Sequence, residues 1–450
     1  MIGRLVVIGL GDVTMRYLVP ALAELMQAGE LADDFSFVGV GRHDESTEWL
    51  RDKAADALRD RSDDDEQSQQ LLVGSMTYRR GDATDAESLA AVFDDSGPVV
   101  VYLALPPAIF AETIDALVDA GLPEGSRLVV EKPFGTDAES AERLNDLIHR
   151  RFDEQDVFRV DHFLGKQTAH NIIAARFANR ILEPVWSHAD ISNVEVVWDE
   201  TLALEGRAGY YDGTGAAKDM LQNHLLQLMC LVAMEPPDSL DQSCVADRKV
   251  EVLRAARPWA QDLASCSVRA RYTAGESDGD EVPAYVDEEG VDPDAATETF
   301  AEITLAIDTA RWRDVPFTLR SGKALAHDCH EIAIHFRRCE HIAFSPDSSG
   351  EPNVLRLRVD PDQLAICLRL SVGGGPDEVA SRELVHGFPE APLGPYALLL
   401  REALIGDVGY SVRDDEAVES WRVIEPFLEA WAENRVPMLE YPAGSPGPAT

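Results

Sequence analysis

The order of apolar and polar positions changes partway along the chain. Up to about residue 150, short β-branched runs alternate with stretches of helical periodicity. Strand-like runs cover residues 4–12, 34–42, 75–82, 98–107 and 126–135, and helices are expected at 15–28 and 46–58 and from near 84, 108 and 137. This alternation predicts a Rossmann-like, doubly wound parallel sheet with helices on its faces. The acidic stretch 62–70 is expected to be a loop.

After about residue 180 the apolar positions alternate with polar ones, which is typical of strands that bury one face. Such runs cover residues 192–200, 267–273, 299–308, 330–338 and 353–372, with helices expected at 216–234, 248–256, 394–406 and 415–433 and a long surface loop at 275–296. The pattern predicts an α+β domain on a large, mainly antiparallel sheet. We therefore expect a dinucleotide-binding domain at 1–175 and a substrate-binding and dimerisation domain at 176–450.

Composition narrows the classes of function. The formal charge of −41 over 450 residues argues against a nucleic-acid partner, because the phosphates would be repelled. No apolar run approaches the roughly 18 residues that a membrane-spanning helix needs. The first ten residues do not resemble a secretory leader, and the six cysteines contain no C-x-x-C pair. These features predict a cytoplasmic protein with reduced thiols.

Lysine is scarce in this chain, and arginine supplies nearly all other positive charge. A compact ammonium group donates in several directions and is not replaced by a planar guanidinium. Each lysine that the chain retains is therefore a candidate for a specific role. They are Lys53, Lys132, Lys166, Lys218, Lys249 and Lys323.

The first strand-like run leads into a glycine turn suited to a dinucleotide. Gly9 and Gly11 would let the backbone approach a pyrophosphate, and the amides of the following helix would face it. Because the third glycine of G-x-G-x-x-G is absent, this turn alone does not distinguish a nucleotide site from a ligand-free turn. Arg42 adds weight, since it follows the second strand, where an arginine accommodates the 2′-phosphate of NADP. Arg42 can also be an ordinary surface charge.

Charged residues also end two later strands, in EKPFG (131–135) and RVDHFLGKQ (159–167). Ligands of open α/β sheets gather at such carboxyl ends. Farther on, Asp219 and His224 lie five positions apart on an apolar helix. Taken singly, each of these residues is more often structural than catalytic.

Seven stretches, in order, resemble the glucose-6-phosphate dehydrogenase family over essentially the whole length. They are YLALPP, EKPFG, RVDHFLGKQ, RFANRILEPVW, EGRAGYYDGTGAAKDMLQNHLLQLMCLVAMEPP, VPFTLRSGKAL and YPAGSPGP. The resemblance implies oxidation of C1 of glucose 6-phosphate to the lactone, with hydride transfer to NADP, although NAD stays open. It also implies a homodimer or a dimer of dimers.

The resemblance further implies roles for individual residues. His224 corresponds to the catalytic base, and Asp161 to the carboxylate that orients it. Substrate contacts are expected from Lys132, His162, Phe163, Lys166, Glu200, Asp219 and Lys323. Cofactor contacts are expected from Gly9, Gly11, Asp12, Arg42, Tyr102 and Lys132. The residue types fit the chemistry, because imidazole is a suitable general base near neutral pH and a phosphate dianion favours cationic donors.

The chain departs from the family pattern in several places. The glycine turn is one residue shorter than usual, Tyr17 stands where a lysine is common, and Phe163 replaces a usual tyrosine. Asp328 stands about where a basic residue helps to bind substrate. These departures leave two alternatives, the same chemistry on another sugar or sugar phosphate, and a catalytically silent regulatory homologue. We expect no metal site, although histidines and cysteines crowd one short span, at His327, Cys329, His330, His335, Cys339 and His341.

Overall fold

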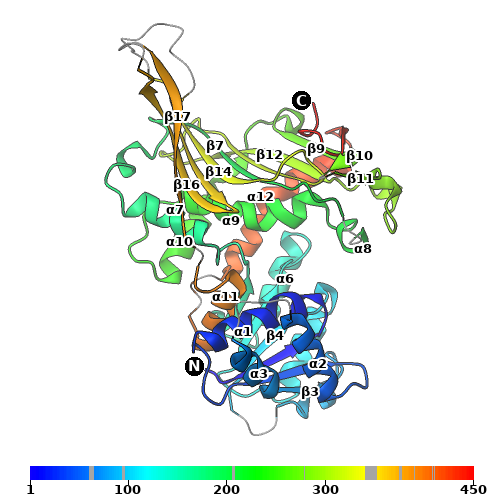
Figure 1. The fold of residues 1–450 in the computed structure, drawn as a ribbon. Coiled ribbons are helices and arrows are strands. Elements are labelled where there is room, and N and C mark those ends of the chain that lie inside the picture. The colour runs from blue at the N-terminus through cyan, green and yellow to red at the C-terminus, as the bar shows by residue number, and fades with distance from the viewer. Residues whose placement is uncertain are drawn as a thin grey trace. The chain divides into compact units, whose positions relative to one another are not determined.

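A computed structural model of the chain describes residues 1–449 except 60–64, 94–96, 205–207, 278, 340–351, 374–377, 390, 408 and 410. The chain divides into two compact units (Figure 1). Unit 1 comprises residues 1–166, 239–246 and 391–418, and unit 2 comprises residues 167–238, 247–390 and 419–450.

Unit 1 is built on a sheet whose strands, in the described residues, follow the order β3-β2-β1-β4-β5-β6. All five neighbouring pairs are parallel. The strands are β1 (Arg4–Ile8), β2 (Ser36–Gly41), β3 (Met76–Arg80), β4 (Val100–Leu103), β5 (Arg127–Glu131) and β6 (Val157–Val160). The expected doubly wound parallel sheet is confirmed.

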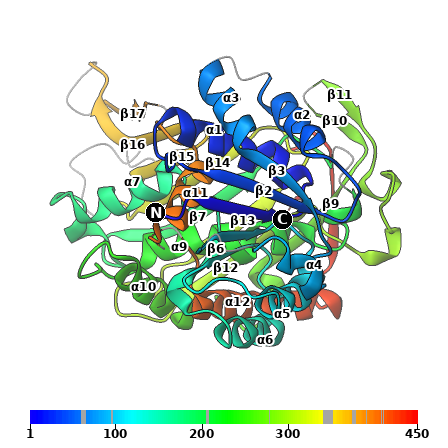
Figure 2. The ribbon, with the colours of Figure 1, turned by 90° about the horizontal axis from the view of Figure 1, so that it is seen from below.

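The helices of unit 1 lie in two groups, with α1, α2 and α3 on one side of the sheet and α4, α5 and α6 on the other (Figure 2). Their bounds are α1 (Val19–Gln27), α2 (Thr47–Leu58), α3 (Glu66–Ser75), α4 (Ala86–Ala90), α5 (Phe110–Asp119) and α6 (Ala138–His149). A π-helical turn, η1 (Thr14–Leu18), precedes α1. Ser46 caps α2 by accepting from the amide of Trp49 at 3.1 Å.

The loop expected at 62–70 is wrong for residues 66–70. These residues begin α3, because the Asp65 side chain caps the helix by accepting from the amide of Gln67 at 3.2 Å, and Leu72 is buried against the core. The local acidity that suggested a loop lies at the helix start, where negative charge is favourable. Residues 62–64 lie outside the described residues.

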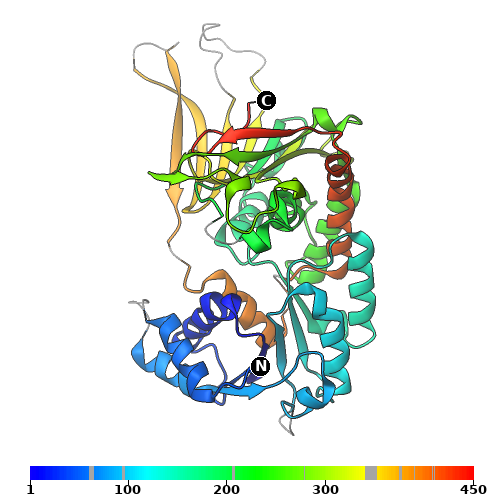
Figure 3. The ribbon, with the colours of Figure 1, turned by 90° about the vertical axis from the view of Figure 1, so that its right-hand side faces the viewer.

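Helix α11 (Pro395–Ile405) belongs to unit 1 although it follows strand β17 of the second sheet in sequence. It packs beside α1, as the orange and blue helices in Figure 3 show. Glu24 on α1 accepts from the amide of Gly394 at 2.7 Å, and Leu400 and Leu404 join the buried core of the unit. A remote segment is thereby fixed against the first helix. The next helix, α12 (Asp414–Ala432), crosses the unit boundary after residue 418.

Unit 2 is built on a large sheet that runs β17-β16-β15-β14-β7-β13-β12-β9-β18 in the described residues, with β8 paired to β12. Most pairs are antiparallel, while β13–β7 and β18–β9 are parallel. The strands are β7 (Ile191–Asp199), β8 (Ala256–Pro258), β9 (Ser267–Thr273), β12 (Phe300–Ile307), β13 (Phe317–Gly322), β14 (Cys329–Phe336), β15 (Val354–Val359), β16 (Asp362–Ser371), β17 (Val379–Gly387) and β18 (Met438–Pro442). The expected mainly antiparallel sheet is confirmed.

Helices of unit 2 cover one face of this sheet (Figure 3). They are α7 (Gln167–Phe177), α8 (Ala208–Tyr211), the π-helical η5 (Ala217–Leu225), α9 (Leu226–Ala233) and α10 (Gln242–Ala255), whose first residues belong to unit 1. The sequence pattern did not predict α7. Its apolar positions lack a clear helical stripe, and tertiary packing against β15 and α9 stabilises it.

The loop expected at 275–296 contains a short hairpin, β10 (Gly275–Ser277) and β11 (Asp280–Val282). Strand β17 is at one edge of the large sheet (Figure 1). Most of its side chains are exposed, including Leu384 and Val385. The expected homodimer stays a prediction.

Within the described residues, no helix has the length and apolar character required to cross a membrane.

Candidate active site

The strand register of unit 1 brings the predicted residues of several loops to one edge of the sheet. Leu103 pairs with Val130, and Glu131 pairs with Val160. Each strand therefore ends at nearly the same level. Lys132 follows Glu131 directly, and Asp161 follows Val160, so the ends of EKPFG and RVDHFLGKQ are neighbours.

The glycine turn after β1 has the backbone that the sequence predicted. Gly9 has φ +101°, and a Cβ there would lie 2.2 Å from the carbonyl oxygen of Ala104, so only glycine fits. Gly11 has open space where a side chain would be. Thr14 donates to the carbonyl oxygen of Gly9 at 2.7 Å, which closes the turn onto the helix start. The helix amides begin directly after the open glycine.

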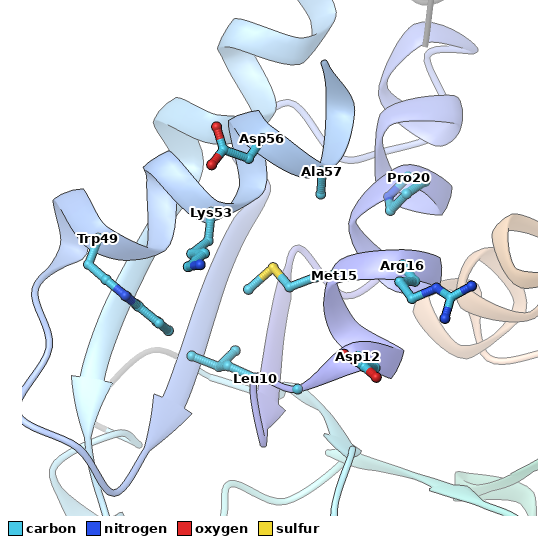
Figure 4. Close-up of a pocket in the computed structure, with 10 residues that line it drawn as sticks. Leu10, Asp12, Met15, Arg16, Pro20, Trp49, Lys53, Asp56 and Ala57 are labelled. Carbon is cyan, nitrogen blue, oxygen red and sulfur yellow. The ribbon is translucent and has the colours of Figure 1, made fainter. Parts of the chain in front are cut away.

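Two other predicted cofactor residues lie at this edge. Asp12 is exposed on the glycine turn, and Arg42 is exposed directly after β2. A cavity of about 720 Å³ adjoins the turn between the start of α1 and helix α2. Figure 4 shows Met15 pointing into this space opposite Trp49 and Lys53, while Arg16 points away. The cavity is lined by Leu10, Gly11, Asp12, Met15, Arg16, Pro20, Trp49, Lys53, Asp56 and Ala57.

Glu131, at the end of β5, lies near two tyrosines. The hydroxyl of Tyr102, a side chain only 1% exposed, donates to the Glu131 carboxylate. Burial, together with the charge of Glu131, raises the pKa of Tyr396 on α11. Burial raises the pKa of Glu131 to about 7, an effect that the Tyr102 hydrogen bond and the charge of Lys132 partly oppose and that of Asp161 increases. The predicted cofactor contact Tyr102 thus has its hydroxyl engaged by Glu131.

The turn after β6 carries four predicted residues in a compact arrangement. Asp161 is 1% exposed and accepts from the amide of Phe163 at 3.0 Å. The rings of His162 and Phe163 meet edge to face, with centroids 5.0 Å apart. The ammonium group of Lys166 lies 5.3 Å from the centroid of the Phe163 ring. Phe163 therefore packs against both predicted phosphate contacts.

In unit 2, His224 lies on η5, where its side chain is 1% exposed. Asn223 accepts from the amide of His224 at 2.6 Å. Glu298 binds the start of this helix by accepting from the amide of Ala217 at 3.0 Å. The π-helical winding is of the kind that recurs at functional sites.

Glu200, Lys323 and Tyr211 form a second group in unit 2. Lys323 donates to Glu200 at 2.7 Å, and its ammonium group lies 5.4 Å from the centroid of the Tyr211 ring. Burial raises the pKa of Tyr211 well above its usual value, and the charge of Asp219 adds to this effect. Three predicted substrate contacts, Glu200, Asp219 and Lys323, are therefore neighbours around one buried tyrosine.

Asp328, the acidic residue that departs from the family pattern, has a local structural role. Its carboxylate accepts from the amide of Thr201 at 2.6 Å. This bond joins the start of β14 to the segment after Glu200. The charge of Asp328 is thus partly balanced by a backbone donor.

Within unit 1, Lys132 and the turn 161–166 lie at one edge of the sheet, and within unit 2 Glu200 and Lys323 are paired. The two predicted catalytic residues, His224 and Asp161, belong to different units. The structure also adds residues that the sequence pattern did not indicate. Glu131 lies inside the EKPFG motif, so the motif itself was a signal for it. Tyr211 likewise lies within a conspicuous stretch. Tyr396 comes from a helix more than two hundred residues away, and no local pattern indicated it.

Two histidines of the crowded span 327–341 have separate partners. His330 stacks on Trp198 with centroids 3.9 Å apart, and His335 lies 3.3 Å from Glu195. His341 lies outside the described residues. Among the residues that are described, the His, Cys, Asp and Glu side chains with the spacing of a metal site are His149, Glu154 and Asp414 in unit 1. Glu154 there already accepts from buried Arg159 at 2.6 Å.

Two models of known protein families together match nearly the whole chain. Residues 6–171 match the model "Glucose-6-phosphate dehydrogenase, NAD binding domain", and residues 173–450 match its C-terminal domain. The glucose-6-phosphate 1-dehydrogenase of Treponema pallidum is 38% identical, over 97% of this chain and 90% of that protein. The protein of the same name from Bacillus subtilis is 36% identical, over 97% and 93%.

Solved structures are similar over the same extent. A glucose-6-phosphate 1-dehydrogenase from Mycobacterium avium has a TM-score of 0.88 and 34% identity, covering 99% of this chain and 95% of that one. A glucose-6-phosphate dehydrogenase in complex with its substrate glucose-6-phosphate has a TM-score of 0.90 and 32% identity, with the same coverage.

The raised pKa of Glu131 predicts a pH dependence of folding stability. The folded state retains a proton on this carboxyl up to about pH 7, whereas the unfolded state loses it near 4.5. The contribution of protonated Glu131 to the free energy of unfolding is therefore fully present below about pH 4.5. It is lost as the pH rises through 7. When the pH is raised from about 5 to about 8, the free energy of unfolding of Glu131→Gln should increase relative to that of the wild type, because the glutamine side chain does not lose a proton.

Denaturant unfolding at the two pH values measures this difference. Glu139→Gln, an exposed change on α6, is the control and should show no such shift. Parallel pH profiles for the wild type and Glu131→Gln would contradict the assignment.

Proposed function

The chain belongs to the glucose-6-phosphate dehydrogenase family, and from this premise we propose that it oxidises C1 of glucose 6-phosphate with a nicotinamide nucleotide. The observation that carries the proposal is the near-complete match to both family domains, which includes relatives named for this activity. Relatives with that name over almost the full length favour this activity over the same chemistry on another sugar and over a silent homologue.

The nucleotide side of the proposal rests on the edge of the unit 1 sheet. Gly9 fits its turn only as glycine, and Gly11 leaves open space where a phosphate would approach the helix amides. The residues present therefore fit a dinucleotide. When bound, the nucleotide supplies the acceptor for the hydride.

Arg42 supports NADP as the nucleotide. It is exposed after β2, at the position where a guanidinium can pair with a 2′-phosphate. A ribose hydroxyl offers no charge to this residue. NADP is therefore the proposed cofactor in preference to NAD.

The sugar side of the proposal divides into two sets of residues. His162 and Lys166 supply cationic donors for the phosphate, while Lys132, Phe163, Glu200, Asp219 and Lys323 complete the set of sugar contacts. The Lys323–Glu200 ion pair at 2.7 Å supports a role in fixing hydroxyl groups, because both partners are already oriented.

His224 is the proposed general base. It accepts the proton of the C1 hydroxyl while hydride leaves the same carbon, so that the carbon becomes the carbonyl of the lactone. Its burial protects the imidazole from bulk water. Asp161 is the proposed carboxylate partner, which would select the tautomer of the imidazole and stabilise the imidazolium.

A substrate panel tests the activity directly. Purified protein should reduce the nicotinamide with glucose 6-phosphate, and kcat/KM should exceed that for free glucose by about a hundredfold or more, since two charge-assisted hydrogen bonds are at stake. The measurement is nicotinamide absorbance with each sugar. Equal activity on glucose and glucose 6-phosphate would reject the phosphate assignment.

The cofactor assignment predicts a selective effect of Arg42→Ala. The variant should lose about tenfold or more in kcat/KM with NADP, because a charge-assisted pair is removed, and should change little with NAD. Arg143→Ala, which removes an exposed guanidinium paired with Glu139 on α6, is the matched control. A similar loss with both nucleotides would count against Arg42 as the selector.

The base assignment predicts that His224→Asn lowers kcat by about a hundredfold to ten-thousandfold, the usual contribution of a general base. Binding of glucose 6-phosphate, measured by isothermal titration, should be largely retained. His327→Asn, at an exposed histidine of the same unit, should leave kcat unchanged. Turnover near the wild-type rate in His224→Asn would remove this residue from the mechanism.

A further inference from the structure

Three rings from distant parts of the sequence stack in unit 1. The rings of Tyr17 and Tyr396 have centroids 5.0 Å apart and an interplanar angle of 17°. The rings of Tyr396 and His162 have centroids 5.4 Å apart and an angle of 16°. Tyr396 thus lies between an exposed tyrosine beside the glycine turn and the histidine after β6. These three residues form a ring stack.

The backbone around the ring stack holds its members in place. A Cβ on Gly165 would lie 2.9 Å from the carbonyl oxygen of Pro395, so the turn after His162 contacts the start of α11 directly. Glu24 on α1 binds the amide of Gly394, the residue before α11, at 2.7 Å. The helix that carries Tyr17 is therefore fixed to the segment that carries Tyr396.

Tyr396 also lies near Glu131, at the end of β5. Burial and the charge of Glu131 raise the pKa of the Tyr396 hydroxyl. The rings on its two faces are nearly parallel to it, at interplanar angles of 17° and 16°, so stacking favours one plane for Tyr396 and for the His162 imidazole.

Tyr17 differs from the other two residues in its exposure. Its side chain is 40% exposed, whereas Tyr396 and His162 are half-buried. One face of its ring covers Tyr396, and the guanidinium of Arg16 lies 5.9 Å from the ring centroid. A small cavity of about 130 Å³ lies beside Tyr17 and Tyr396, between α1 and α11. Loss of the Tyr17 ring would release one face of Tyr396.

We propose that Tyr17 is a positioning residue for sugar-phosphate binding, because its ring holds Tyr396 flat against His162 and so sets the orientation of the imidazole donor. The proposal rests on the proposed function in one respect, that His162 contacts the phosphate. It assigns to Tyr17 a role through the ring stack and no contact with the nucleotide.

Tyr17→Leu tests this role by removing the ring while keeping an apolar side chain. The KM for glucose 6-phosphate should rise about threefold to tenfold, the scale of one aromatic pair, while kcat and the KM for the nucleotide change by less than about twofold. Tyr17→Phe keeps the ring and should restore the wild-type KM. Trp259→Leu removes an aromatic side chain of similar exposure (38%) in unit 2 and serves as the matched control.

A double-mutant comparison separates positioning from a general structural effect. In the His162→Ala background, Tyr17→Leu should have no further effect on the KM for glucose 6-phosphate, since the group that it positions is absent. An equal rise in KM with and without His162 would overturn the proposal. A rise in the nucleotide KM as large as that in the sugar-phosphate KM would overturn it as well.

Inorganic phosphate provides a measurement that does not depend on turnover. Its dissociation constant, obtained by isothermal titration, should rise about threefold to tenfold in Tyr17→Leu and stay near the wild-type value in Tyr17→Phe. If the wild type fails to oxidise glucose 6-phosphate, the proposed function fails and this titration alone decides the role of Tyr17. If the wild type is active and both the KM and the phosphate affinity of Tyr17→Leu are unchanged, the ring-stack proposal fails while the function stands.

Discussion

The parallel register of the unit 1 sheet is the constraint on which its candidate site depends. Because β1, β4, β5 and β6 pair in parallel and end at nearly the same level, loops that are far apart in sequence open on one edge. These loops need no direct attraction to one another to become neighbours. They are the glycine turn after β1, the EKPFG segment after β5 and the turn 161–163 after β6. A shift in this register would move Lys132 away from Asp161 and leave the turn at Gly9 without the close approach of Ala104.

That edge also concentrates groups that are withdrawn from water. Tyr102, Glu131 and Asp161 come together there, and burial raises the pKa of Glu131 towards neutrality. In a chain with a formal charge of −41, most carboxylates lie in water, where their repulsion is screened. Several that are drawn inward have specific partners: Glu131 accepts from the Tyr102 hydroxyl, Asp161 and Glu298 accept from backbone amides, and Asp199 pairs with Arg320. The free-energy cost of burying these carboxylates is confined to their immediate surroundings, and so are the shifts of their pKa values.

Three of the scarce lysines likewise have specific partners in the structure. Lys323 pairs with Glu200, Lys166 lies over the ring of Phe163, and Lys249 is buried against Gln227 at 2.9 Å. Each has a defined partner that a planar guanidinium would meet with different geometry. Scarcity alone did not separate these roles, since Lys249 reads in sequence like any other helical lysine, and only the burial of its helix shows that it is structural.

The sequence by itself determined the fold class and the strand-end motifs and supplied the predictions of site residues, because these depend on local periodicity and on long, ordered motif matches. It did not indicate α7, whose helix depends on packing against other elements, and it misread residues 66–70, where a capped helix begins in an acidic stretch. Tyr396 shows the limit most clearly. Nothing near it in sequence indicates a partner, yet α11 packs on α1 and brings its ring between Tyr17 and His162. Contacts between segments hundreds of residues apart leave no local periodicity, so only the tertiary structure decided them.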